Sequence, residues 1–340
     1  MKRRVNVNFT YLLYDDKCIL SIDINKIFYE QNPKAYTFYT FFQKGSIFKA
    51  FCRLRWRKDL KKVCARLMAA INFENSAHNT VMRKKLGLCL GAGGARGVAH
   101  LGVIAALEEA DVEIDVIAGC SMGAVIGGGY ASGLTVNKMK KIFFNMKRSD
   151  LVDILCAGRR GALCGGKKLV DLLNDNLKVR DFESTRLPFG CVATDLRSGK
   201  PVYMTEGNLV TAIQASAAIP MVFPPVERGP YLLLDGGVLE RVPVVLTKKL
   251  GADVVVAVDA LGTLPDFVGT KSMLDVGLRV LAVIDCHLSK RASRRLSDIC
   301  ILPRLGDMSS FKVEGLKFAF ERGFEAGAEA VPEIKALLKG

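Results

Sequence analysis

From residue 84 onward, short continuous apolar runs alternate with longer segments in which apolar residues recur at helical spacing. The short runs predict buried strands and the periodic segments predict helices. The predicted strands are 84–90, 112–118, 189–194, 201–204, 231–234, 253–258 and 299–303. The predicted helices are 98–110, 121–132, 136–146, 169–177, 209–218, 273–296 and 311–338. Strands that alternate with helices indicate a layered α/β domain.

The region before residue 84 has a different pattern. Residues 1–45 show no clean period, and the aromatic stretch 34–42 is interpreted as a strand or a disordered arm. Residues 47–71 place apolar side chains on one side of a predicted helix and Lys and Arg on the other. Such a helix is a candidate for lying on an anionic membrane surface, or for covering a groove of the main domain with its basic face in water.

Charge separates the same two regions. Residues 1–85 carry 18 Lys or Arg and 6 Asp or Glu, a net charge of +12 out of +15 for the whole chain. No nucleic-acid-binding module accompanies this charge, so nucleic acid is not an expected partner. The predicted organisation is a basic, aromatic appendage at 1–80, a main domain at 84–304 and a helical segment at 305–340 packed on it.

The ten cysteines are scattered, with no Cys-x-x-Cys pair and no metal-type spacing to the three histidines. They are interpreted as small buried residues in a reducing compartment, with no metal site. Asp15, Asp16 and Lys17 interrupt the N-terminal region before any adequate apolar run, so no secretory signal is expected. The predicted location is the cytoplasm, with a peripheral position on the inner face of the membrane as an extension.

The first candidate for chemistry is Gly119-Cys120-Ser121-Met122-Gly123, between a predicted strand and a predicted helix. A Gly-x-Ser-x-Gly turn in this context exposes a nucleophilic serine beside the positive end of the helix dipole. The alternative is a plain glycine-rich turn. Residues 116–137 contain no charge, which is long enough for a membrane span, but the six glycines within 117–134 favour a tightly packed helix in a layered domain.

A second glycine-rich turn, residues 91–97, follows the first predicted strand of the main domain and precedes a helix. Backbone N–H groups in such a turn bind anions. A dinucleotide fingerprint requires a third glycine where Arg96 stands and an acidic residue after the next strand, and both are missing. The amides of Gly93, Gly94 and Ala95 are therefore candidates for an oxyanion hole in acyl transfer.

A nucleophilic serine also needs a base. Among the histidines only His287 follows the possible acidic partners, and it lies in a predicted amphipathic helix, where a histidine is more often a surface or boundary residue. Three aspartates stand at predicted strand ends, Asp195, Asp235 and Asp259. Asp235 differs from the other two because Gly236 and Gly237 allow a close backbone approach.

Four motifs in this order carry a family resemblance: 93–97 (Gly-Gly-Ala-Arg-Gly), 119–123, 215–220 (Ala-Ser-Ala-Ala-Ile-Pro) and 235–237 (Asp-Gly-Gly). The stretch from about Lys85 to Pro303 resembles the patatin-like phospholipase family, in its bacterial-type branch. The resemblance implies a three-layer α/β/α fold with a mostly parallel central sheet, a Ser–Asp dyad, and hydrolysis of lipid acyl esters without metal or cofactor.

By that resemblance Ser121 is the nucleophile and Asp235 the proton acceptor, with the oxyanion hole at Gly93, Gly94 and Ala95. The residues that would support these motifs are Arg96, Gly97, Gly119, Gly123, Gly236 and Gly237. Arg96 is expected to brace the glycine loop, with contact to a phosphate head group as the alternative.

Two departures from the family pattern bear on the site. Ala92 replaces a common glycine, and Glu240-Arg241 replaces an asparagine often found before the Val-Pro pair. Glu240 would raise the pKa of Asp235 if its carboxylate faced the site.

The expected function is therefore hydrolysis of phospholipid or lysophospholipid esters, with segment 47–71 meeting an anionic membrane. The alternatives are a catalytically silent lipid-binding protein of the same fold, and a Ser-His-Asp esterase that uses His287.

Overall fold

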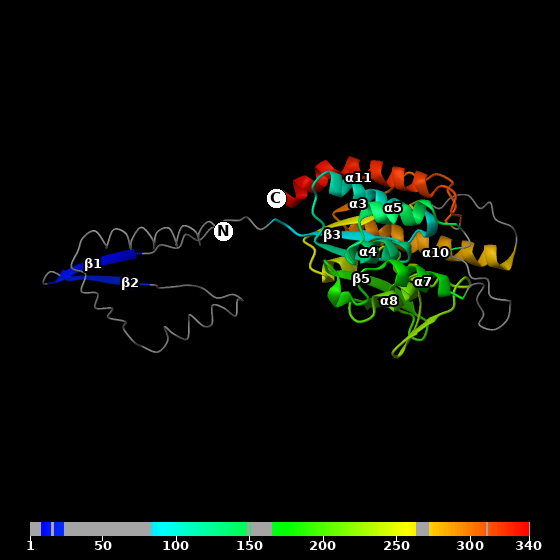
Figure 1. Cartoon of the computed structure of the whole chain (residues 1–340), viewed down its shortest axis with the longest axis horizontal. Helices are drawn as coiled ribbons and strands as arrows, with labels where there is room; N and C mark the ends of the chain where they lie inside the picture. The colour runs from blue at the N-terminus through cyan, green and yellow to red at the C-terminus, as the bar shows by residue number, and fades with distance from the viewer. Residues whose placement is uncertain are drawn as a thin grey trace. The chain divides into compact units, whose positions relative to one another are not determined.

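The computed structural model describes residues 8–14, 17–23, 83–147, 150, 165–262, 272–310 and 312–339. The chain divides into two compact units, Met1–Thr80 and Val81–Gly340 (Figure 1). In the first unit, β1 (Asn8–Tyr14) pairs antiparallel with β2 (Lys17–Asp23). The sequence pattern missed this hairpin. The predicted helix at 47–71 and the aromatic stretch 34–42 lie outside the described residues.

The second unit is built around an eight-stranded sheet in the order β10-β9-β3-β4-β5-β8-β7, with β6 also paired to β5. Strands β10, β9, β3, β4 and β5 are parallel, whereas β6, β8 and β7 join by antiparallel pairing. The strands are β3 (Leu86–Leu90), β4 (Val116–Gly119), β5 (Phe189–Asp195), β6 (Lys200–Met204), β7 (Val226–Arg228), β8 (Tyr231–Asp235), β9 (Val254–Val258) and β10 (Ile299–Ile301).

Helices cover both faces of this sheet. The α-helices are α3 (Ala99–Glu109), α4 (Met122–Ala131), α5 (Val136–Phe144), α7 (Lys167–Asn176), α8 (Leu209–Ser216), α9 (Val244–Lys249), α10 (Met273–Leu296) and α11 (Leu316–Lys339). Short 3-10 turns are η1 (Gly94–Val98), η2 (Phe182–Ser184) and η3 (Gly236–Val238). In Figure 1, α11 lies beside α3, on which it packs.

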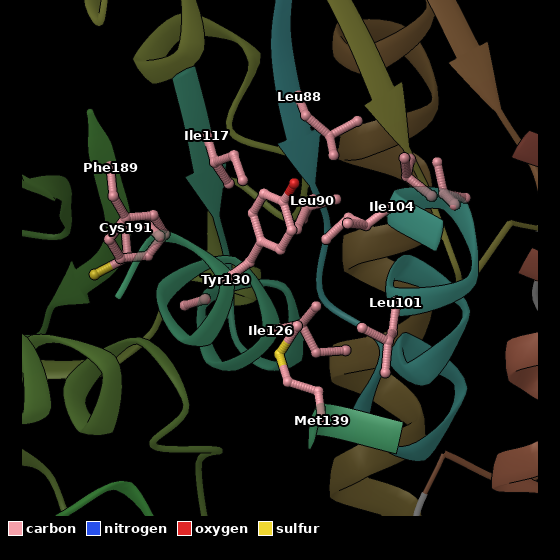
Figure 2. Close-up of a cluster of buried hydrophobic side chains, with 14 of the residues drawn as sticks. Leu88, Leu90, Leu101, Ile104, Ile117, Ile126, Tyr130, Met139, Phe189 and Cys191 are labelled. Atoms are coloured by element: carbon pink, nitrogen blue, oxygen red, sulfur yellow. The ribbon is translucent and has the colours of Figure 1, made fainter. Parts of the chain in front are cut away.

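Successive side chains of a strand pack into cores on opposite faces of the sheet. Leu88 and Leu90 of β3 pack with Leu101 of α3 and Ile126 of α4 in the larger core (Figure 2). Cys89, between those two leucines, packs instead with Val244 of α9. Since neighbouring residues in a strand point to opposite faces, the sheet is the middle layer of three. The predicted three-layer α/β/α fold with a mostly parallel sheet is confirmed.

Several boundaries differ from the prediction. The strand predicted at 112–118 begins at Val116. The residues before it are a loop, in which the Asp115 carboxylate accepts hydrogen bonds from Leu86 N at 2.6 Å and Arg83 Nη1 at 2.8 Å. Hydropathy alone does not register these side-chain contacts, so the strand predicted from the apolar run extends too far toward the N-terminus.

The apolar and glycine-rich stretch 116–137 is not a membrane span in this fold. It divides into β4, the short α4 and the start of α5. Among the described residues, no helix is both long enough and apolar enough to cross a membrane.

Candidate active site

Ser121 occupies the turn between β4, which ends at Gly119, and α4, which begins at Met122. Its backbone has φ 54° and ψ −120°, a region that a residue with a Cβ rarely adopts. A Cβ on Gly119 would lie 2.5 Å from Gly123 O, and one on Gly123 would collide with Leu90 O. The two glycines therefore permit the tight crossing that holds Ser121 in this strained conformation.

The backbone of this turn is held from a second motif. Ser216, the last residue of α8, accepts a hydrogen bond from the Ser121 N–H at 3.0 Å through its Oγ. The same hydroxyl donates to Val192 O of β5 at 2.7 Å. Ser216 is fully buried, so it links the turn, α8 and the central sheet. The segment 215–220 was recognised in the sequence, but this contact was not predicted.

Strand pairing brings Asp235 toward the same turn. β6 runs along one edge of β5, pairing with Cys191 and Ala193 among others. Both β4 and β8 pair with the opposite edge of β5. There Gly119, the last residue of β4, pairs with Cys191, and Asp235, the last residue of β8, pairs with Ala193. Since β4 is parallel and β8 antiparallel to β5, their C-terminal ends approach each other along one edge. The residues that follow Gly119 therefore lie next to Asp235.

Hydrogen bonds agree with this placement. Asp235 Oδ1 accepts from Gly237 N at 2.8 Å, and the Cys120 thiol lies 3.8 Å from the same oxygen. The Asp235 N–H donates to Ala218 O at 2.9 Å, which ties β8 to the segment after α8. Both Ser121 and Asp235 are buried, each with 5% of its surface exposed. A carboxylate and a strained serine turn thus share one shielded site.

The other two strand-end aspartates have structural partners. Asp195 accepts from Ser198 Oγ at 2.6 Å and from Leu232 N at 3.0 Å. These bonds, led by that of Ser198, lower the pKa of Asp195 to about 2. Asp259 forms an ion pair with Arg241 at 2.7 Å, and both side chains are buried. Asp195 and Asp259 therefore have structural partners, and Asp235 is the one of the three that lies at the serine turn.

The glycine loop 91–97 lies against both parts of the site. A Cβ on Gly97 would lie 2.6 Å from Met122 Cγ, so the loop contacts the residue that follows Ser121. A Cβ on Gly237 would lie 3.5 Å from that of Ala92, so the loop also adjoins the turn after Asp235. Gly94 has φ 53°, a left-handed conformation that favours glycine.

The amides of this loop are not equivalent. Ala95 N donates to Ser310 O at 2.8 Å, and this bond occupies the N–H expected to bind an oxyanion. Within the described part of the chain, the N–H groups of Gly93 and Gly94 make no comparable hydrogen bond to a backbone carbonyl. Of the three expected amides, Ala95 N is thus already hydrogen-bonded within the protein, and those of Gly93 and Gly94 are the better candidates for an oxyanion hole.

Arg96 holds the loop in place. Its Nε donates to Ala260 O at 3.1 Å, and its Nη1 donates to Gly306 O and Met308 O, each at 2.9 Å. The side chain is buried, and burial lowers its pKa. All three contacts are to backbone carbonyls, so the structure supports bracing over contact with a head group.

His100 supports the loop from α3. Its Nε2–H donates to Gly91 O at 2.7 Å. Because a carbonyl oxygen can only accept, Nε2 carries a proton. Burial lowers the pKa of His100 to about 4, so the ring is neutral at pH 7. Its Nδ1 has no hydrogen-bond partner among the described residues. Its role in holding the loop had no signal in the sequence pattern.

Glu240 is engaged by an aromatic neighbour. The Tyr203 hydroxyl donates to Glu240 Oε2 at 2.7 Å, and Lys249 Nζ lies 4.6 Å from the centre of the Tyr203 ring. Burial raises the pKa of Glu240. The carboxylate of Glu240, a residue that differs from the family pattern, thus has a hydrogen-bond donor in Tyr203.

His287 falls within α10 as predicted, and its side chain lies outside the described residues. In the described ranges, no cluster of three or more His, Cys, Asp or Glu side chains has a geometry suited to a metal ion. The described site offers a serine, a carboxylate and unpaired amides, which is a set of groups suited to acyl transfer.

Comparison with known proteins places these motifs in context. The family described as patatin-like phospholipase matches residues 88–247. An uncharacterized NTE family protein of Mycobacterium tuberculosis is 38% identical over 180 residues, covering 53% of this chain and 50% of that protein. Lysophospholipase nte1 of Emericella nidulans is 32% identical over 213 residues, covering 57% of this chain and 13% of that protein.

The match to these relatives is partial, because the chain spans at most about half the length of each of them. Among solved structures, VipD from Legionella pneumophila superposes with a TM-score of 0.50 at 15% identity, covering 74% of this chain and 67% of VipD. At that identity the likeness shows the fold alone.

Proposed function

Because this chain belongs to the patatin-like phospholipase family through residues 88–247, we propose that it is a serine acyl hydrolase acting on phospholipids or lysophospholipids. The observation that supports this most is the meeting of two strand ends along β5. It puts the carboxylate of Asp235 beside the turn that carries Ser121. The substrate class comes from the family and from the relative named a lysophospholipase.

In the proposed reaction, Asp235 takes the proton of the Ser121 hydroxyl as Oγ attacks the acyl carbonyl. The carbonyl oxygen becomes an oxyanion, and the N–H groups of Gly93 and Gly94 donate hydrogen bonds to it. Asp235 then returns the proton to the departing alcohol oxygen, which leaves an acyl-serine. In the second half, Asp235 takes a proton from water, the resulting hydroxide attacks the acyl carbon, and the fatty acid departs as Ser121 regains its proton.

The environment favours this chemistry over simple binding. Ser121 stands at the N-terminus of α4, where the helix dipole stabilises developing negative charge. Asp235 Oδ1 is held by Gly237 N and approached by Cys120 Sγ, which orients the carboxylate. Burial of both residues limits the access of bulk water and strengthens electrostatic interactions within the site.

The proposal is tested by labelling the full chain with a fluorophosphonate probe, which reacts with activated serines. We expect one adduct in the wild type and none in Ser121→Ala. The release of fatty acid from lysophosphatidylcholine should be lost in the same variant. A folded wild type that neither labels nor hydrolyses would favour a silent lipid-binding protein instead.

We also propose that segment 47–71 draws the protein to anionic membranes from the cytoplasmic side, on the basis of its basic amphipathic sequence. Such binding is electrostatic and should weaken as salt is added. Vesicle binding that ignores salt would contradict it.

A further inference from the structure

The helix α10 carries a row of exposed apolar side chains along one side. The exposed fractions are 93% for Met273, 46% for Val276, 50% for Val280, 38% for Val283 and 47% for Ile284. These residues recur every three to four positions, which places them on one face of a helix. We call this row the α10 stripe. Single exposed apolar side chains are ordinary, but a contiguous row of them marks an interaction surface.

The α10 stripe adjoins the candidate active site. The backbone of α10 at Gly277 lies against Met221, because a Cβ there would be 2.9 Å from Met221 Sδ. Met221 directly follows the segment that carries Ser216, and 37% of its surface is exposed. α10 also contacts η3, the turn that follows Asp235, and Leu239 just after it is 37% exposed. The apolar surface therefore continues from the helix to the two segments that hold the site.

The charge of α10 suits an anionic surface. Its sequence contains five basic residues and two acidic ones. Arg279 and Asp275 lie within the stretch that the stripe spans, and Asp285, Lys290, Arg291, Arg294 and Arg295 follow it toward the C-terminal end of the helix. An apolar helix face combined with an excess of basic residues is typical of helices that lie in the headgroup region of a membrane.

We propose that the α10 stripe is the surface through which the catalytic unit docks on a phospholipid layer. This inference rests on the proposed function, because a lipid ester must leave its layer to reach the buried Ser121. A layer lying on the stripe would present its acyl chains beside Met221 and Leu239, next to the site. A protein partner on the stripe would cover the same approach, so the lipid layer fits the position better. This surface is distinct from the basic segment 47–71.

The test compares the full-length wild type with Val280→Glu/Ile284→Glu, which places two charges in the middle of the stripe. Both positions are already exposed, so the fold should tolerate the change. The matched control is Phe318→Glu on α11, a residue that is 42% exposed and outside the stripe. Binding is measured by co-sedimentation with phosphatidylcholine vesicles and with vesicles that also contain phosphatidylglycerol. Hydrolysis is measured on vesicle phospholipid and on soluble p-nitrophenyl butyrate.

We expect the double variant to lose about tenfold in vesicle binding and in vesicle hydrolysis, because charged groups resist transfer to the membrane interface. Its hydrolysis of the soluble ester should match that of the wild type, and Phe318→Glu should behave as wild type throughout. Vesicle binding by the double variant equal to that of wild type would overturn the inference. So would light scattering that shows a wild-type dimer converted to a monomer by the two charges. If no protein hydrolysed the soluble ester, the proposed function would fail, while the binding comparison would still decide the role of the stripe.

Discussion

The hydroxyl of Ser216 accepts a hydrogen bond from the backbone N–H of Ser121 at 3.0 Å, and it donates to Val192 O at 2.7 Å. One buried side chain thus ties the strained serine turn to a central strand. The strain at Ser121 persists because the surrounding structure over-determines it. Ser216 is therefore a positioning residue for the proposed nucleophile.

Replacing Ser216 with Ala should affect both stability and activity. The variant leaves a buried N–H without its acceptor, which costs about 1–3 kcal/mol in free energy of unfolding. The matched control is Ser132→Ala, since the buried Ser132 hydroxyl donates to Gly129 O at 2.7 Å outside the serine turn. Urea unfolding should show a loss in both variants, whereas ester hydrolysis should fall only in Ser216→Ala. Equal activity in the two variants would show that the contact is structural only.

His100 should make stability depend on pH. Burial lowers its pKa from 6.5 to about 4, so between these values the unfolded chain binds a proton that the folded chain does not. The contribution of the buried, neutral His100 ring to the free energy of unfolding is therefore complete above pH 6.5 and is lost as the pH falls toward 4. The shift corresponds to a change on the order of 3 kcal/mol in the free energy of unfolding.

The replacement His100→Gln keeps an N–H donor for Gly91 O but removes the titration. Urea unfolding at pH 7 and pH 5 should show a smaller difference in the variant than in the wild type. Identical differences would mean that folding does not lower the pKa of His100.

Breaking the buried ion pair of Arg241 and Asp259 should lower the free energy of unfolding more than breaking an exposed ion pair does. Asp259→Ala removes the carboxylate that Arg241 contacts at 2.7 Å while the buried guanidinium remains. We expect a loss of about 3–5 kcal/mol in the free energy of unfolding. The exposed pair of Arg322 and Glu325 is the control, and Glu325→Ala should cost less than about 1 kcal/mol. Equal losses of free energy of unfolding in Asp259→Ala and Glu325→Ala would contradict the larger contribution expected of the buried pair. Because Ala92 N donates to Arg241 O at 2.9 Å, the glycine loop should also shift and reduce activity.

The sequence predicted the layered fold because buried strands such as β9 are continuous apolar runs, which stand out from the helical periodicity of the segments between them. It did not detect α9 or β7, which are short, nor the hairpin of β1 and β2. Short elements carry too few positions for a period to stand out from chance, so their formation depends on tertiary pairing.

The candidate site was predicted from four ordered motifs and the family that they resemble, which singled out Ser121, Asp235 and the glycine loop. What the motifs could not supply is how backbone groups are partnered. The bond from Ala95 N to Ser310 O joins residues far apart in the chain, as do those that Ser216 makes to Ser121 and Val192. Each of these follows from the packing of separate elements, which no local pattern encodes.

The proposed reaction depends most on Asp235 acting as the base for Ser121, and one set of rates tests this role directly. Hydrolysis of p-nitrophenyl butyrate is measured for the full-length wild type, Ser121→Ala, Asp235→Asn and His287→Ala, with the fold of each checked by circular dichroism. We predict that the Ser121 and Asp235 variants lose at least about a hundredfold in kcat, the usual scale for a general base, while His287→Ala retains the wild-type rate. Loss of activity in His287→Ala with retention in Asp235→Asn would contradict the dyad and establish a histidine-dependent esterase.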